Sequence, residues 1–67
     1  MRDKKFIVML LQGNKVIEES DIVEAVDWMS LMDTKVYKEM KKKIIPEYAD
    51  WHKTPDNYMR VSYRRVK

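Results

Sequence analysis

The only histidine of this chain, His52, has the side chain most suited to chemistry near neutral pH, because an imidazole can bind a metal or take up a proton. The carboxylates of Glu47 and Asp50 lie close to it in sequence. A metal site needs three or four converging ligands, and a catalytic base needs a nucleophile and an orienting group. The chain has no cysteine, and its only glycine is Gly13, so thiolate ligands and a glycine-rich phosphate loop are both excluded. We therefore expect no enzyme activity, no metal and no cofactor, and we expect His52 to be an exposed loop residue.

Basic residues are the second group that can do chemistry, and they are concentrated in residues 35–43 and 60–67. Lysines neutralise phosphates without reading sequence, and arginines and aromatic rings on an open strand can bind phosphates and stack on bases. The predicted nucleic-acid contacts are Lys35, Lys38, Lys41, Lys42, Tyr58, Arg60, Arg64 and Arg65. The alternatives are a solvated helix face for the lysines and an edge strand protected by charge for the arginines.

Acidic and aromatic residues form a third group. Residues 21–34 contain four acidic residues and no basic one. Asp21, Glu24 and Asp27 are expected to line one side of a helix, either as a solvated face or as a contact for a basic partner. Trp28 lies off the apolar stripe of that helix, so we expect it to be partly exposed and available to a partner, because tryptophan is enriched at interface centres. We expect Trp51 to pack its loop onto the core.

The elements that position these residues begin with a β-hairpin over residues 5–18. Residues 6–11 are apolar, and Gly13-Asn14 suits a two-residue hairpin turn with glycine in the first central place. In that register Leu11 lies opposite Val16 and Leu10 opposite Ile17. The first strand is apolar on both faces, which is typical of a central strand covered on both sides.

Two helices and a last strand are expected to follow. The acidic start at Asp21, with Glu24 three residues later, predicts a helix over residues 21–32. Thr34 opens a second helix over residues 34–45, which Pro46 ends. Residues 46–57 are predicted to be a loop, and the alternation in residues 58–66 predicts a half-buried strand. The expected fold is therefore a small α+β domain of order ββααβ, with a three-stranded sheet and both helices on one face.

That architecture leaves one apolar sheet face open. The residues expected there are Ile7, Met9, Leu11 and Val16. An exposed apolar patch usually marks an interface, so the face predicts a homodimer or a protein partner. The alternative is that residues 46–53 wrap around and cover it.

Size and composition restrict the function further. A chain of 67 residues is expected to form one domain, and domains of this size are marginally stable. No run of about 18 apolar residues is present, and no signal-peptide pattern precedes the first strand, so we expect no membrane partner and a cytoplasmic location.

The sequence is compatible with two functions. The first is a regulatory or accessory factor that binds nucleic acid, with RNA or single strands favoured over duplex. The second is a protein-binding modulator that acts through the apolar sheet face and the acidic helix, such as an inhibitor or antitoxin-like factor of the kind that phages and mobile elements encode. The placement of the basic clusters separates them: one continuous basic face favours nucleic acid, and clusters on opposite sides favour a protein partner.

Overall fold

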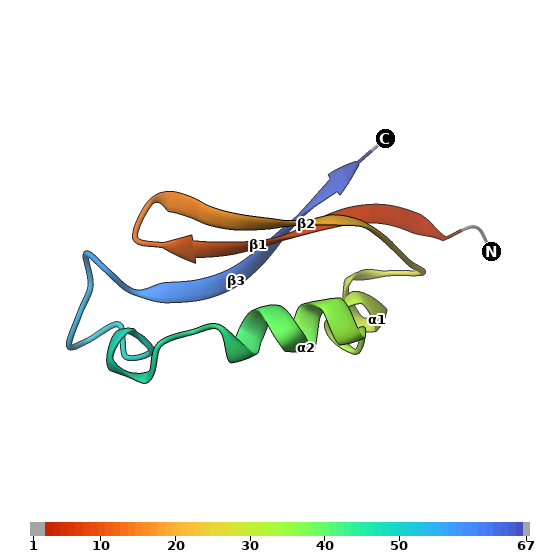
Figure 1. The fold of residues 1–67 in the computed structure, drawn as a ribbon. Helices are drawn as coiled ribbons and strands as arrows, with labels where there is room; N and C mark the ends of the chain where they lie inside the picture. The colour runs from red at the N-terminus through yellow and green to blue at the C-terminus, as the bar shows by residue number, and fades with distance from the viewer. Residues whose placement is uncertain (1–2, 67) are drawn as a thin grey trace.

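The computed structural model describes residues 3–66. Within this part of the chain a single antiparallel sheet has the strand order β2-β1-β3, with β1 in the centre (Figure 1). The predicted α+β class and the order ββααβ are confirmed. The elements are β1 (Lys4–Gln12), β2 (Lys15–Ala25), α1 (Trp28–Met32), α2 (Lys35–Lys42), a short 3-10 helix η1 (Pro46–Tyr48) and β3 (Met59–Val66).

The turn between β1 and β2 is the predicted glycine turn. Gly13 has a φ of +61°, and no other described residue has a positive φ, which fits a turn with glycine in the first central place. The N–H of Gly13 donates a hydrogen bond of 2.9 Å to the carbonyl oxygen of Tyr58, so the start of β3 is tied to this turn.

Two β-bulges on β2 change the register that the hairpin turn sets. Leu11 lies opposite Val16, as predicted, but Leu10 lies opposite Glu18 and not Ile17. A second irregularity lies between the pairs Ile7 with Ile22 and Met9 with Glu19. In each case β2 carries one residue more than β1, which bends the strand and increases its twist. The register predicted beyond Leu11 was therefore wrong.

The prediction of a helix over residues 21–32 was also wrong over its first part. Residues 21–25 continue β2, where Val23 lies opposite Phe6 and Glu24 opposite Lys5. Asp27, and not Asp21, caps the helix: its carboxylate accepts a hydrogen bond of 2.8 Å from the N–H of Ser30. Long-range strand pairing therefore overrides a local capping pattern, and α1 keeps only five residues.

The second helix follows the sequence more closely. Thr34 caps α2, since its hydroxyl oxygen accepts a hydrogen bond from the N–H of Tyr37. The helix ends at Lys42, three residues before the predicted end, and Ile45 is extended as expected of a residue before proline.

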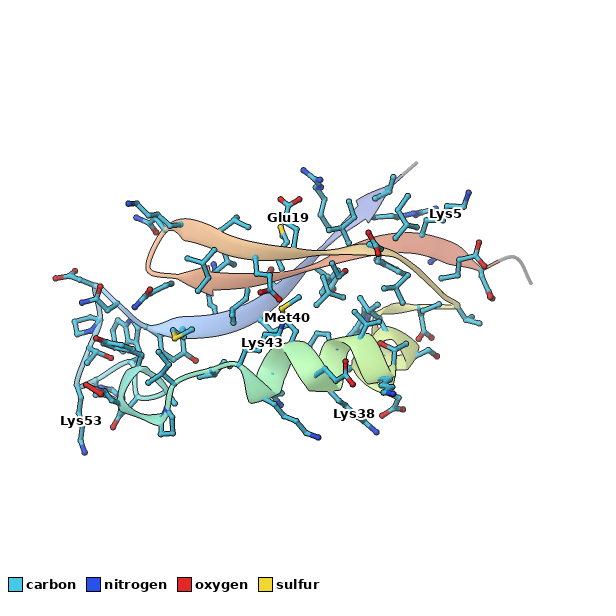
Figure 2. All side chains as sticks on the ribbon, viewed as in Figure 1. Lys5, Glu19, Lys38, Met40, Lys43 and Lys53 are labelled. Carbon is cyan, nitrogen blue, oxygen red and sulfur yellow. The ribbon has the colours of Figure 1, made fainter. Side chains whose placement is uncertain are left out.

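The core lies between the sheet and α2. Phe6, Val8 and Leu10 of β1 contribute one face, and Met40 of α2 lies between the helix and the sheet (Figure 2). The ring of Tyr63 packs edge-on against Phe6 at a centroid distance of 5.7 Å. The remaining buried members of this cluster are Ala25, Leu31, Tyr37 and Met59.

The opposite face of the sheet carries no covering layer within residues 3–66. Figure 1 shows α1, α2 and the segment that follows α2 on one side of the sheet. Tyr48 of η1 packs against the same core cluster as α2. The alternative in which residues 46–53 wrap over the second face is therefore wrong, and that face is open.

Candidate functional site

The open sheet face has an apolar centre. In the register of the sheet Ile7 lies beside Ile22, and Leu11 lies beside Val16. Residues directly opposite each other on paired strands share a face, so these four side chains and Met9 form one surface. Val16 is 46% exposed and Ile22 is 55% exposed, whereas Ile7 and Met9 are half-buried and Leu11 is buried. The four residues predicted for this face (Ile7, Met9, Leu11 and Val16) are brought together, and Ile22 joins them because β2 is longer than the sequence indicated.

Charges of opposite sign lie on the two sides of this apolar centre. On β3, Arg60 is opposite Leu11 and Arg64 is opposite Ile7, so both arginines project from the open face. On β2, Glu19 is opposite Met9 and Glu24 is opposite Lys5. The open face therefore consists of three parallel columns. The acidic column on β2 carries Glu19 and Glu24, with Val16 and Ile22 on the same strand face; the apolar column on β1 is Ile7, Met9 and Leu11, with Lys5 at its end; and the basic column on β3 carries Arg60 and Arg64 with Ser62 between them.

The two predicted basic clusters lie on opposite sides of the sheet. Lys35, Lys38, Lys41 and Lys42 are exposed residues of α2, which covers the core face. Figure 2 shows Lys38 pointing away from the sheet on the outer side of α2, while Glu19 lies on the other side of the sheet. Arg65 is opposite Phe6 and so belongs to the core-side row of β3, apart from Arg60 and Arg64. The clusters do not form one face.

The predicted aromatic contact Tyr58 lies just before β3, at the hairpin end of the molecule. There it lines a shallow hollow of ≈ 240 Å³ with Trp51, Arg60, Gly13 and Asp56. Trp51 is 57% exposed, so the expectation that it packs its loop onto the core was wrong. Its place beside Arg60 depends on how the loop folds back onto the hairpin turn, which no local pattern shows.

A second exposed apolar surface surrounds α1. This helix buries Leu31 completely, while Trp28 is 52% exposed and Met29 is 63% exposed. Met32, one turn after Trp28, is also exposed, as is Val26 just before the helix. Side chains three and four positions apart are neighbours on a helix, so Trp28, Met29 and Met32 form a continuous knob. We call this group, with Val26, the α1 knob.

The capping carboxylate of Asp27 fixes the position of the α1 knob. The hydrogen bonds from Ser30 are the main cause that lowers the pKa of Asp27 below its ordinary value of 3.8. Because the pKa is lower in the folded state, the ionised carboxylate stabilises the fold at any pH above the ordinary pKa. This stabilisation is lost as the pH falls through the lowered pKa of the folded state. The cap is therefore charged and in place throughout the neutral range.

The acidic residues predicted to line a helix lie instead on a strand. Asp21 and Glu24 belong to β2, and only Asp27 remains at a helix end. Asp21 lines a groove of ≈ 270 Å³ between β2 and α2, together with Glu18, Glu39 and Lys43. Glu18 forms an ion pair with Lys43 across this groove. Among residues 3–66 no three metal-ligating side chains converge on one point.

His52 is exposed in the loop after η1, as predicted. Its backbone N–H donates a hydrogen bond of 2.9 Å to the carboxylate of Asp50, and its ring packs edge-on against Trp51.

None of the helices described here has the length and apolar character to cross a membrane. Comparison with protein-family models, curated proteins and solved structures found no match to this chain.

Proposed function

We propose that this protein is a small, non-catalytic modulator that binds another protein through the α1 knob. The observation that carries the proposal is the composition of α1, which buries one residue, Leu31, and presents Trp28, Met29 and Met32 to solvent. Tryptophan and methionine are enriched in the buried centres of protein interfaces, and methionine adapts its shape to a partner. A helix of five residues has little stability of its own and is held in place by packing, which here comes from the buried Leu31. The exposed Trp28, Met29 and Met32 add nothing to that packing, so they have no evident structural role.

The charges around the α1 knob indicate the chemistry of the partner. Asp27 and Asp33 flank α1, and residues 21–34 contain no basic side chain; Lys4 of β1 is the cation that acts on Asp27. Complementary charge steers association and selects partners. The expected partner surface is therefore an apolar pocket, large enough for an indole ring, with a basic rim.

The first prediction concerns Trp28, and the chain supplies a matched control. Trp28→Ala should weaken partner binding at least about tenfold, because truncating an aromatic anchor at an interface centre typically has this effect or a larger one. Trp51→Ala removes an equally exposed indole at the far end of the molecule and should leave binding unchanged. Both variants and the wild-type chain are immobilised and used to capture proteins from extract of the source cells. Titration calorimetry with the purified partner then gives the affinities.

A captured protein that depends on Trp28 and not on Trp51 supports the proposal, and its affinity should fall with salt because of the acidic surround. If no captured protein depends on Trp28, or if Trp51→Ala removes the same protein, the α1 knob is not the binding surface.

Binding of single-stranded nucleic acid is a second candidate, favoured by the hollow in which Trp51 and Tyr58 lie beside Arg60. Aromatic rings next to a guanidinium can stack bases and hold a phosphate. Against it stands the separation of the arginines from the lysines of α2.

The second prediction tests this candidate with a fluorescent RNA and a DNA duplex over a salt series. If the hollow binds single strands, affinity for RNA should fall with a log–log slope of about −0.7 per neutralised phosphate. Arg60→Ala with Arg64→Ala should then abolish binding, while the control pair Lys38→Ala with Lys41→Ala should retain it. Absence of binding at low salt would remove this candidate.

A further inference from the structure

We propose that the open sheet face is the contact surface of a symmetric homodimer, in which the acidic column of each copy lies over the basic column of the other. This inference goes beyond the proposed function, because it concerns a different face of the molecule from the α1 knob. It rests on the layout of the three columns in the register of the sheet.

The symmetry of a face-to-face pair decides which columns meet. Most homo-oligomers are two-fold dimers, and stacked sheets align their strands within about 30°. A two-fold axis parallel to β1 places β1 over β1, and β2 of each copy over β3 of the other. The apolar column then meets itself, and the basic column meets the acidic one on both sides. Lys5 at the end of β1 faces its own copy there, beside Glu24, its partner in the sheet.

The other arrangements bring like charges together. A two-fold axis in the same plane but across the strands places β2 over β2 and β3 over β3. With that axis at the Met9 row, Glu19 meets Glu19 and Arg64 meets Arg60. Edge-to-edge pairing of two β2 strands or of two β3 strands would do the same. Like charges placed opposite each other select against an interface. The charge pattern therefore favours one geometry among those that a two-fold axis allows.

The register places the charged groups at matching heights along the strands. Glu19, Met9 and Ser62 form one cross-strand row. An axis parallel to β1 keeps each row at its own height, so Glu19 of one copy lies opposite Ser62 of the other. Ser62 lies between Arg60 and Arg64 on the same face of β3, since side chains two residues apart point the same way. Each copy thus offers its Glu19 to two guanidinium groups, and every such contact occurs twice.

The size of the chain supports a partner on this face. Domains of about 60 residues bury only about 60% of their unfolded surface, and below roughly 70–80 residues a single core is commonly supplemented by disulfides, metals or association. This chain has no cysteine, and no converging metal ligands occur among residues 3–66. A second copy covers Ile7, Met9, Val16 and Ile22 without any further component.

The third prediction uses two charge-reversal variants. Arg60→Glu with Arg64→Glu makes both outer columns acidic, and Glu19→Lys with Glu24→Lys makes both basic. Each variant alone should be monomeric, with dimerisation weakened by at least about a hundredfold, because both contacts of the pair then join like charges. An equimolar mixture of the two should form a heterodimer, since every contact again joins opposite charges. Sedimentation equilibrium measures the mass in each case.

The control is Lys38→Glu with Lys41→Glu, which alters the net charge by the same amount as the arginine variant but on the outer side of α2. This control variant should dimerise like the wild-type chain.

Circular dichroism verifies that each variant is folded. A wild-type chain that is monomeric up to millimolar concentration would overturn the proposal. So would a charge-reversal variant that dimerises normally, or a mixture that stays monomeric. Trp28→Ala should leave the mass unchanged, so failure of the dimer and failure of the α1 knob can be told apart.

Discussion

Gly13 meets two separate demands at the turn between β1 and β2. Its φ of +61° lies in the left-handed region, which side chains with a Cβ adopt only at a cost in energy. A Cβ at this position would also collide with the backbone carbonyl oxygen of Asp56. The first demand follows from the Gly13-Asn14 pair in the sequence. The second does not, because it depends on the distant loop that leads into β3.

The fourth prediction follows from these two demands. Gly13→Ala should lower the free energy of unfolding by about 2 kcal/mol, because a left-handed non-glycine residue costs about 1–3 kcal/mol and the loop must also move. Asn14→Ala, at the neighbouring exposed turn position, should change it by less than about 0.5 kcal/mol. Urea denaturation measures both. Equal effects of the two substitutions would mean that neither the backbone angle nor the contact with Asp56 matters for stability.

β2 is the element where sequence reasoning and structure diverge most. Asp21 and Glu24 have the spacing of a capping box, and Ile22, Val26 and Met29 recur at helical spacing, so local signals favour a helix. The strand signal in the same residues is an alternation of Val23 and Ala25 with exposed neighbours, which is too short to outweigh them. Pairing with the strongly apolar β1 decides the outcome, and this pairing is a long-range effect that a local pattern does not contain.

Ser20 supports the bulge that makes this pairing possible. Its hydroxyl oxygen accepts a hydrogen bond of 3.0 Å from the N–H of Val8 and donates one of 2.8 Å to the carbonyl of Asp21. The hydroxyl thus stands in for the β2 backbone at a point where the bulge interrupts the ladder. Val8 is fully buried, so its N–H depends on this partner.

The fifth prediction is that Ser20→Ala lowers the free energy of unfolding by about 1–3 kcal/mol, because the buried N–H of Val8 loses its acceptor. Hydrogen exchange at the Val8 amide should also be faster in the Ser20→Ala variant than in the wild-type chain. Ser30→Ala is the control, since Ser30 is exposed and its hydrogen bonds, from the backbone N–H and from the hydroxyl, go to the carboxylate of Asp27 and not to a buried amide. An unchanged exchange rate at Val8 would mean that water or a shifted strand replaces the hydroxyl.

At the scale of the whole molecule, the sequence predicts the layers better than the surfaces. A first strand that is apolar on both faces predicts a central strand, a three-stranded sheet and one open face, and all three are present. The arrangement of charges on that face could not be predicted from the sequence, because the two bulges on β2 decide which face of the sheet Glu19 occupies. The exposure of Trp28 was predicted, but from a helix that begins seven residues too early. The prediction that Trp51 packs on the core was wrong, because its neighbours Gly13 and Arg60 come from the hairpin turn and from β3, which are distant in sequence.

The two ladders of the sheet close very different lengths of chain. The β1–β2 hairpin closes across two residues, whereas the pairing of β3 with β1 closes a segment that contains β2, both helices and the loop after them. Hairpins form within microseconds, and closing a longer segment carries a larger entropic barrier. β3 is therefore expected to dock last during folding and to detach first during unfolding. Because β3 carries the basic column, a second copy seated on the open face would hold this strand in place, and association would slow unfolding more than it speeds folding.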